Sequence, residues 1–292
     1  MTSKKVAIIR LLSASLIILF LLMGGQHLSI RDALAKSNGS GLYLVGLGPG
    51  DPDLATLRAM EVIKQADLVI CSQTIRQSFI HALKGKEILE TSGMFWRFYG
   101  KDCSALKEEE RSRCEEITGK RNKIIAKVRQ EVKKDKCIAI LDKGDALIYG
   151  PWAWSLEEFQ DLDPMVVPGV SCFNAAHAAL KKDVTWSDTV KSTILTANDW
   201  PGTRDSIENM ASNQVSMVIF MMGLQLKDLV VKLSTYYPPH TPIAIICHAG
   251  YREKEHVIKG TLGTIMNKTR DGKLPFEHLV YVGENLNFKW KK

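Results

Sequence analysis

The sequence predicts an α/β fold made of two α/β domains, with parallel-rich sheets and a cleft between the domains. From residue 41 onward, short aliphatic and β-branched runs alternate with segments of helical period. Such alternation is typical of parallel strands, because each parallel pair needs a crossover connection. The chain has 292 residues, enough for two domains of ordinary size, and its second half repeats the alternation.

We expect the first domain at residues 41–162, with a boundary near Leu162-Asp163-Pro164. Its apolar runs have the length and composition of strands: Leu42–Val45, Leu68–Cys71, Cys137–Leu141 and, just past the boundary, Met165–Val167. Helical periodicity predicts helices at Thr56–Ala66 and Ile117–Lys134. Residues 93–116 show neither period, and we expect a long loop there.

The second domain is expected at residues 165–288. Its predicted strands are Thr193–Leu195, Met217–Met221, Ile243–Cys247 and His278–Val282, and its predicted helices are Phe173–Leu180, Arg204–Met210 and Leu226–Ser234. Ligands of α/β proteins usually bind at the carboxyl ends of strands or between domains, so we look for a site there.

A glycine-proline loop follows the first predicted strand. Gly46, Gly48 and Gly50 allow positive φ angles and close backbone approach to a ligand, while Pro49 and Pro52 stiffen the loop. The alternative is a tight strand-to-helix turn that binds nothing.

Residues 1–35 differ from the rest of the chain in composition and are predicted to be a signal peptide or membrane anchor. Lys4, Lys5 and Arg10 precede Leu11–Met23, an uncharged run of 13 residues that is short for a bilayer span. Small residues at Ala33-Leu34-Ala35 suit a signal peptidase. We therefore expect an exported, periplasmic or membrane-anchored protein with its domains outside the cytoplasm, and membrane contact through residues 6–23. The alternative is a cytoplasmic protein with a buried N-terminal helix.

Charge and cysteine content narrow the class of partner. The net charge of +7 comes partly from the first 35 residues, and no basic stripe is interleaved with aromatic residues, so we expect no nucleic-acid partner. A polyanionic small molecule would suit the remaining charge.

The six cysteines lack metal-ligand spacing, and no metal site is expected. Cys103 and Cys114 flank a charged segment and could form a disulfide in an oxidising compartment, but their spacing does not decide it.

Six segments of the chain contain distinctive sequence motifs: Gly46–Pro52, Lys143–Gly150, Val167–Ser171, Ser187–Thr196, Phe220–Gly223 and Thr241–Leu262. In this order they resemble the tetrapyrrole (corrin/porphyrin) methylases, and the resemblance covers residues 41–286. The segment Glu87–Met94 is most similar to the branch that methylates precorrin-4 on the cobalamin pathway. Ser72 and Ser92 depart from the branch of porphyrin biosynthesis that methylates uroporphyrinogen.

The resemblance implies S-adenosylmethionine (SAM) as cofactor, bound by Pro49, Gly144, Asp145, Ile148, Ser171, Cys172, Met222 and Ala249. SAM has no phosphate, so it needs glycine backbone and an apolar slot for adenine, which Ile148 and Met222 suit. The alternatives are a turn cap for Asp145 and a core position for Met222. Ala146 stands where the family has proline, which loosens this loop.

The resemblance further implies a SAM-dependent C-methyltransferase, a tetrapyrrole substrate and a homodimer. Asp51, Asp53 and Tyr149 are the candidate bases for the proton that the acceptor loses. Arg76 and Arg97 are candidates for gripping its carboxylates, with an ordinary solvated surface as the alternative. For His248 we expect a structural role. The alternative function is an exported, non-catalytic tetrapyrrole-binding or carrier protein, because SAM is cytoplasmic and the leader points outward.

Overall fold

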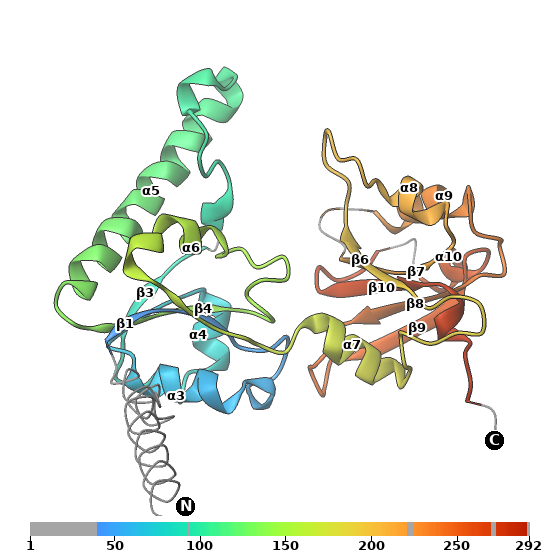
Figure 1. Ribbon diagram of the computed structural model, residues 1–292, viewed down its shortest axis with the longest axis horizontal. Coiled ribbons are helices and arrows are strands. Elements are labelled where there is room, and N and C mark those ends of the chain that lie inside the picture. Colours follow the sequence, from blue (N-terminus) through green and yellow to red (C-terminus); the bar gives the residue numbers. More distant parts are fainter. Residues whose placement is uncertain (1–39, 93, 221–222, 224, 270–272, 291–292) are drawn as a thin grey trace, which may run out of the picture. The chain divides into compact units, whose positions relative to one another are not determined.

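The computed structural model describes residues 40–92, 94–220, 223, 225–269 and 273–290 (Figure 1). The predicted leader at residues 1–35 lies outside this part of the chain. The first sheet contains β1 (Gly41–Gly46), β2 (Leu68–Cys71), β3 (Glu87–Glu90), β4 (Cys137–Asp142) and β5 (Met165–Val167). Its order is β3-β2-β4-β1-β5 and every pair is parallel. All five carboxyl ends therefore lie at one edge.

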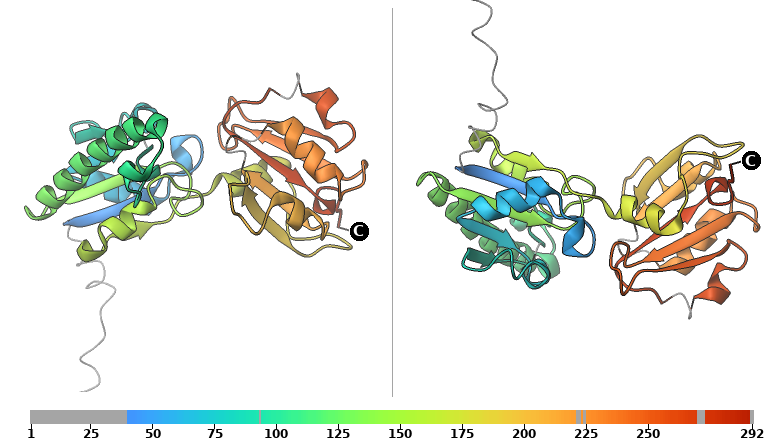
Figure 2. Two further views of the ribbon diagram at one scale, coloured as in Figure 1. Left: turned by 90° about the horizontal axis from the view of Figure 1, so that it is seen from above. Right: turned by 90° about the horizontal axis from the view of Figure 1, so that it is seen from below.

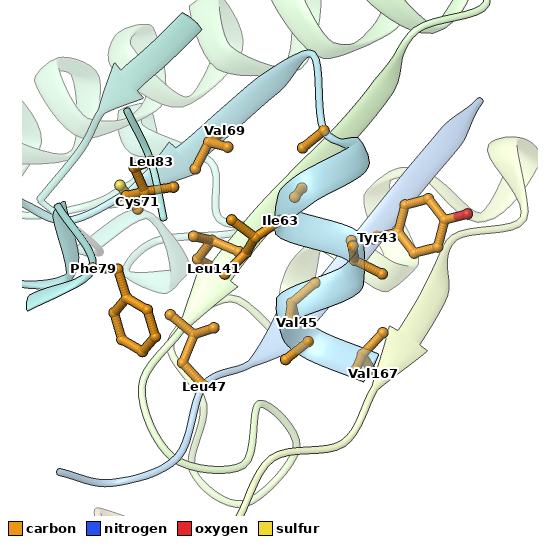
Figure 3. Packing of buried hydrophobic residues seen from close by; sticks show 14 of the residues in the cluster. Tyr43, Val45, Leu47, Ile63, Val69, Cys71, Phe79, Leu83, Leu141 and Val167 are labelled. Atoms are coloured by element: carbon orange, nitrogen blue, oxygen red, sulfur yellow. The ribbon is translucent and has the colours of Figure 1, made fainter. Parts of the chain in front are cut away.

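Helices cover both faces of this sheet because its central strands are buried on both sides (Figures 1 and 2). One face packs against α3 (Leu57–Gln65) and α4 (Gln73–Ser78), where Val45, Ile63 and Leu141 share a core (Figure 3). The other face packs against α5 (Glu108–Val132) and α6 (Trp154–Glu158), whose Val128 and Trp154 join Ile140. Four of the predicted strands are confirmed here. β3 was not predicted as a strand, because its ends are exposed and charged.

The start of α5 corrects the prediction of a long loop over residues 93–116. The helix begins at Glu108, and its first turn carries three glutamates, which the positive end of the helix dipole favours. A disulfide joins Cys103 to Cys114, with 5.6 Å between their Cα atoms. The buried Arg121 donates hydrogen bonds to the carbonyls of Phe95 and Arg97. The exposed first turns carry no apolar stripe, so periodicity could not find them.

The second sheet contains β6 (Thr193–Ala197), β7 (Ser216–Phe220), β8 (Pro242–Cys247), β9 (His256–Thr261) and β10 (His278–Val282), in the order β6-β7-β10-β8-β9. The β6–β7 pair is parallel and the other three pairs are antiparallel. The α/β class is confirmed. This sheet is mixed because a hairpin, not a helix, connects β8 to β9, and β9 was missed because none of its residues is buried.

Helices α8 (Ile207–Ala211), α9 (Leu226–Ser234) and α10 (Ile265–Lys268) cover one face of the second sheet, and α7 (Cys172–Leu180) covers the other (Figure 1). The α9 prediction matches both ends of the helix. The predicted helix over Arg204–Met210 begins later, at Ile207, because Ser206 caps it by accepting a hydrogen bond from Asn209 N.

Candidate functional site

Three glycines pack their backbones together at the carboxyl edge of the first sheet. A Cβ atom on Gly46, at the end of β1, would lie 2.7 Å from the oxygen of Gly144 and from the nitrogen of Gly169. Gly48 and Gly144 exchange two backbone hydrogen bonds, of 3.2 and 2.8 Å. Only glycine leaves room for these approaches. The loops that follow β1, β4 and β5 therefore form one continuous backbone surface.

The β8–β9 hairpin turn rests on the first of these loops. Asp51 N donates to Gly250 O at 2.9 Å, and Arg252 N donates to a carboxylate oxygen of Asp51 at 3.0 Å. The guanidinium of Arg252 also forms an ion pair with Asp53. A Cβ atom on Gly250 would lie 3.2 Å from Cγ of Pro49. Pro49 and the backbone next to Ala249, both predicted cofactor contacts, are thus brought together.

The loop after β4 presents Asp145 and Ile148. Asp145 accepts hydrogen bonds from Leu147 N at its side chain (2.8 Å) and from Ile148 N at its carbonyl (3.3 Å), so it has the role of turn cap. Ile148 packs in one apolar cluster with Cys172 and Ala249. Three of the predicted cofactor residues therefore share one apolar surface.

Ser171 and Cys172 begin helix α7. The Ser171 hydroxyl caps the helix by accepting a hydrogen bond from Phe173 N at 3.2 Å. Burial raises the pKa of the Cys172 thiol, so the side chain behaves as a small neutral group. Met222 lies outside the described residues.

A charged network that was not predicted as part of the site joins the loop after β4 to the second sheet. Lys143 donates to the Tyr251 hydroxyl at 2.7 Å and forms a short ion pair with Glu277. His248 Nδ1 lies 3.3 Å from the other carboxylate oxygen of Glu277. Partial burial opposes ionisation of Glu277, but Lys143 and His248 outweigh it and hold the pKa of Glu277 below its usual value. Lys143 stands inside the predicted loop, yet no sequence pattern connects it with Glu277.

Asp142, at the end of β4, holds the same loop through hydrogen bonds to its backbone. Its carboxylate accepts from Lys143 N at 2.8 Å and from Trp152 N at 3.4 Å, so it ties together both ends of residues 143–152. The side chain is buried, and burial raises its pKa to about 7. The predicted strand ends at Leu141 and leaves Asp142 out, so the role of Asp142 was missed.

Comparison with known proteins identifies the family. Residues 41–266 match the family model of the tetrapyrrole (corrin/porphyrin) methylases. The chain belongs to this family.

Several relatives of this tetrapyrrole methylase have assigned activities. It is 28% identical over 260 residues to the cobalt-precorrin-4 C(11)-methyltransferase of Methanocaldococcus jannaschii, covering 87% of this chain and 91% of that one. It is 27% identical to a uroporphyrinogen-III C-methyltransferase of the same organism, covering 84% and 96%. Among solved structures, a cobalt precorrin-4 methyltransferase superposes with a TM-score of 0.67 at 20% identity, covering 84% of this chain and 95% of that one. A uroporphyrin-III C-methyltransferase from Thermus thermophilus, complexed with S-adenosylhomocysteine, has a TM-score of 0.59 at 19% identity, covering 85% and 99%.

The two arginines predicted to hold substrate carboxylates have different neighbours. Arg76, on α4, forms an exposed ion pair of 3.2 Å with Glu90 at the end of β3. The guanidinium of Arg97 lies 5.2 Å from the centre of the Phe98 ring. Arg76 comes after β2 and Arg97 after β3, and both strands end at the carboxyl edge of the first sheet. Their roles in the methylase remain predictions.

The predicted bases are already engaged. Asp51 is held by the backbone of the hairpin turn, and Asp53 pairs with Arg252. Tyr149 packs its ring 4.8 Å from that of Phe220, and burial raises its pKa. Among the described residues, no group of three His, Cys, Asp or Glu side chains could hold a metal ion. No described helix is long and apolar enough to cross a membrane.

Proposed function

We propose that this tetrapyrrole methylase transfers a methyl group from SAM to a ring carbon of a corrin precursor of the precorrin-4 type. The observation that carries the proposal is the meeting of Gly46, Gly144 and Gly169 beside the apolar surface of Ile148 and Ala249. Glycine backbone admits the amino-acid tail of the cofactor closely, and the apolar surface suits adenine.

The bound cofactor would supply an activated methyl group on a sulfonium. The protein then needs to position that methyl in line with a nucleophilic carbon, and positioning supplies most of the acceleration. The packed glycine backbones hold the loops after β1, β4 and β5 together. The hydrogen bonds between Asp51 and the 250–252 turn hold that turn against the loop after β1.

The choice of acceptor rests on two supports. The segment Glu87–Met94 resembles the precorrin-4 branch, and Ser72 and Ser92 depart from the uroporphyrinogen branch. Two relatives are named for methylation of cobalt-precorrin-4 or precorrin-4 at C-11. Arg76 and Arg97 are proposed to hold the carboxylates of this acceptor, and we further propose a homodimer.

The Cys103–Cys114 disulfide favours an oxidising compartment, and with the sequence of residues 1–35 it supports a protein exported to the periplasm or anchored outside the cytoplasm. The second candidate function follows from that location: an exported tetrapyrrole carrier that keeps the fold without the reaction. A fusion of residues 1–60 to a reporter that is active only outside the cytoplasm tests the location.

Calorimetric titration of the purified chain with SAM and S-adenosylhomocysteine tests the cofactor site. Radiolabelled SAM is then offered together with precorrin-4 or, as the comparison substrate, uroporphyrinogen III. The proposal predicts micromolar binding and label in the precorrin-4 product. A folded protein that binds a tetrapyrrole but not SAM would favour the carrier.

A further inference from the structure

His248 is held in an unusual backbone conformation at the carboxyl end of β8. Its φ angle is 51°, in the left-handed region that non-glycine residues seldom adopt. Its backbone N donates to the carbonyl of Glu277 at 2.8 Å, and its ring Nδ1 lies 3.3 Å from a Glu277 carboxylate oxygen. Such strain persists only where the surroundings enforce it, and it concentrates at functional sites.

Glu277 is fixed in turn by Lys143, which pairs with its other carboxylate oxygen. Lys143 is itself held by the hydroxyl of Tyr251 and lies 4.7 Å from the centre of that ring. An ionised Glu277 favours the imidazole tautomer with the proton on Nδ1, because that proton can be donated to the carboxylate. The Nε2 atom of His248 then carries a free lone pair.

His248 also lies among the loops that form the candidate cofactor site. It directly precedes Ala249, which packs with Ile148 and Cys172. The loop after β4 reaches it through Lys143 and Glu277, and the loop after β1 contacts the same turn at Gly250. The ring is 27% exposed, so it is accessible without being free in solvent.

Carbon methylation by SAM releases a proton from the acceptor, and a positioned base can take it. The S–CH3 bond breaks with its electron pair left on sulfur, the acceptor carbon forms the new C–CH3 bond, and the acceptor gives up one proton. Asp51 accepts a backbone hydrogen bond from Arg252, and burial raises the pKa of Tyr149, which keeps that phenol protonated. Neither group is well placed to take the proton.

We propose that His248 Nε2 accepts the proton released by the tetrapyrrole, with Glu277 and Lys143 as positioning residues. The inference rests on the proposed function. The reaction then balances as SAM plus acceptor giving S-adenosylhomocysteine, the methylated acceptor and a protonated His248, which afterwards releases its proton to water. The ionised carboxylate of Glu277 stabilises the imidazolium that forms.

The charged and titratable groups around His248 come from four segments of the chain. Glu277 precedes β10, Lys143 follows β4, and Tyr251 belongs to the hairpin turn, with its ring centre 6.2 Å from that of His248. His256, at the start of β9, has its ring centre 6.5 Å away. Glu277 contacts the His248 ring directly, Lys143 holds Glu277, and Tyr251 holds Lys143.

The test is single-turnover transfer of labelled methyl from SAM to precorrin-4 by the full chain, over a range of pH. For the wild type the rate should fall as the pH is lowered, because a protonated imidazole accepts nothing. His248→Gln should lower the rate about 100-fold or more and abolish this acid limb, with SAM affinity unchanged. His256→Gln, a neighbouring exposed histidine, is the matched control and should retain both the rate and the limb.

Glu277→Gln provides a second variant that keeps the shape of the network. It should slow transfer less than His248→Gln does and shift the acid limb. A His248→Gln protein with wild-type rate and pH profile would overturn the inference while leaving the proposed function intact. Loss of SAM binding in that variant would also overturn it, in favour of a cofactor-positioning role. No transfer by the wild type, with SAM bound, would overturn the proposed function and this inference with it.

Discussion

Gly50 lies so close to the backbone of Gly250 that it has no room for a side chain. A Cβ atom on Gly50 would overlap the carbonyl oxygen of Gly250, and one on Gly250 would lie 2.8 Å from a methyl carbon of Leu54. The adjacent Asp51 N donates to the same Gly250 oxygen at 2.9 Å. This contact between the backbones of residues 50–51 and 250, here called the crossing, joins the loop after β1 to the turn between β8 and β9.

Gly50→Ala should therefore separate the two loops. We expect it to weaken SAM binding and to reduce the free energy of unfolding by about 1–3 kcal/mol, because backbone atoms cannot yield as a flexible side chain would. Calorimetry and denaturant unfolding measure the two effects. Gly119→Ala is the control: nothing lies within 4 Å of its Cβ position in α5, so this change should stabilise the helix by about 0.5–1 kcal/mol. Equal SAM affinity for Gly50→Ala and the wild type would contradict a role for the crossing.

Asp142 should make stability depend on pH in an unusual direction. Its pKa rises from 3.8 in an unfolded chain to about 7 in the folded one, chiefly through burial, so the folded state holds a proton that the unfolded state has released. Stability from this group is present below about pH 4 and is lost as pH rises to about 7, by at most about 4 kcal/mol. Denaturant unfolding at pH 4.5 and pH 7.5 compares the wild type with Asp142→Asn. The asparagine variant should lose less stability over this interval, and an identical loss in both proteins would refute the assignment.

The Cys103–Cys114 disulfide should stabilise the oxidised protein. It closes a loop with a sequence separation of 11, for which chain entropy predicts about 3 kcal/mol. A Cys103→Ser/Cys114→Ser variant should unfold at lower temperature than the oxidised wild type. Dithiothreitol should lower the Tm of the wild type and leave that of the double variant unchanged. A reductant effect of equal size on both would point instead to other thiols.

Arg76→Gln should raise the KM for the tetrapyrrole by about tenfold and leave SAM affinity unchanged, because a charge-assisted hydrogen bond to a carboxylate is lost. Initial rates with labelled SAM at varied acceptor concentration measure it. Arg113→Gln removes an exposed positive charge from α5 and is the matched control. Equal KM values for both variants would assign Arg76 to its ion pair with Glu90 alone.

The sequence predicted most of the strands because their residues are apolar throughout. β1 and β4 lie in the interior of the first sheet, where helices cover both faces and nearly every side chain is buried. β3 and β9 occupy sheet edges and carry polar residues, so they lack that signal. Local chemistry alone could not distinguish them from loops.

The residues of the candidate site likewise include some that the sequence predicted and some that only the fold reveals. Gly48 and Pro49 stand in a loop whose glycines and prolines predict a special backbone, whereas Gly144 was predicted through the resemblance to the methylases. Lys143 and Glu277 lie 134 residues apart, and only the folded chain shows that they pair. The roles of ordinary charged residues depend on such distant neighbours, which no local pattern records.

The contact between Asp51 and the 250–252 turn also bears on synthesis by the ribosome. Loop residues 48–53 leave the exit tunnel early, but the turn that contacts them follows about two hundred residues later. A growing chain therefore lacks this contact through most of translation. The two loops can pair only after the β8–β9 hairpin has been synthesised, so this part of the fold forms among the last.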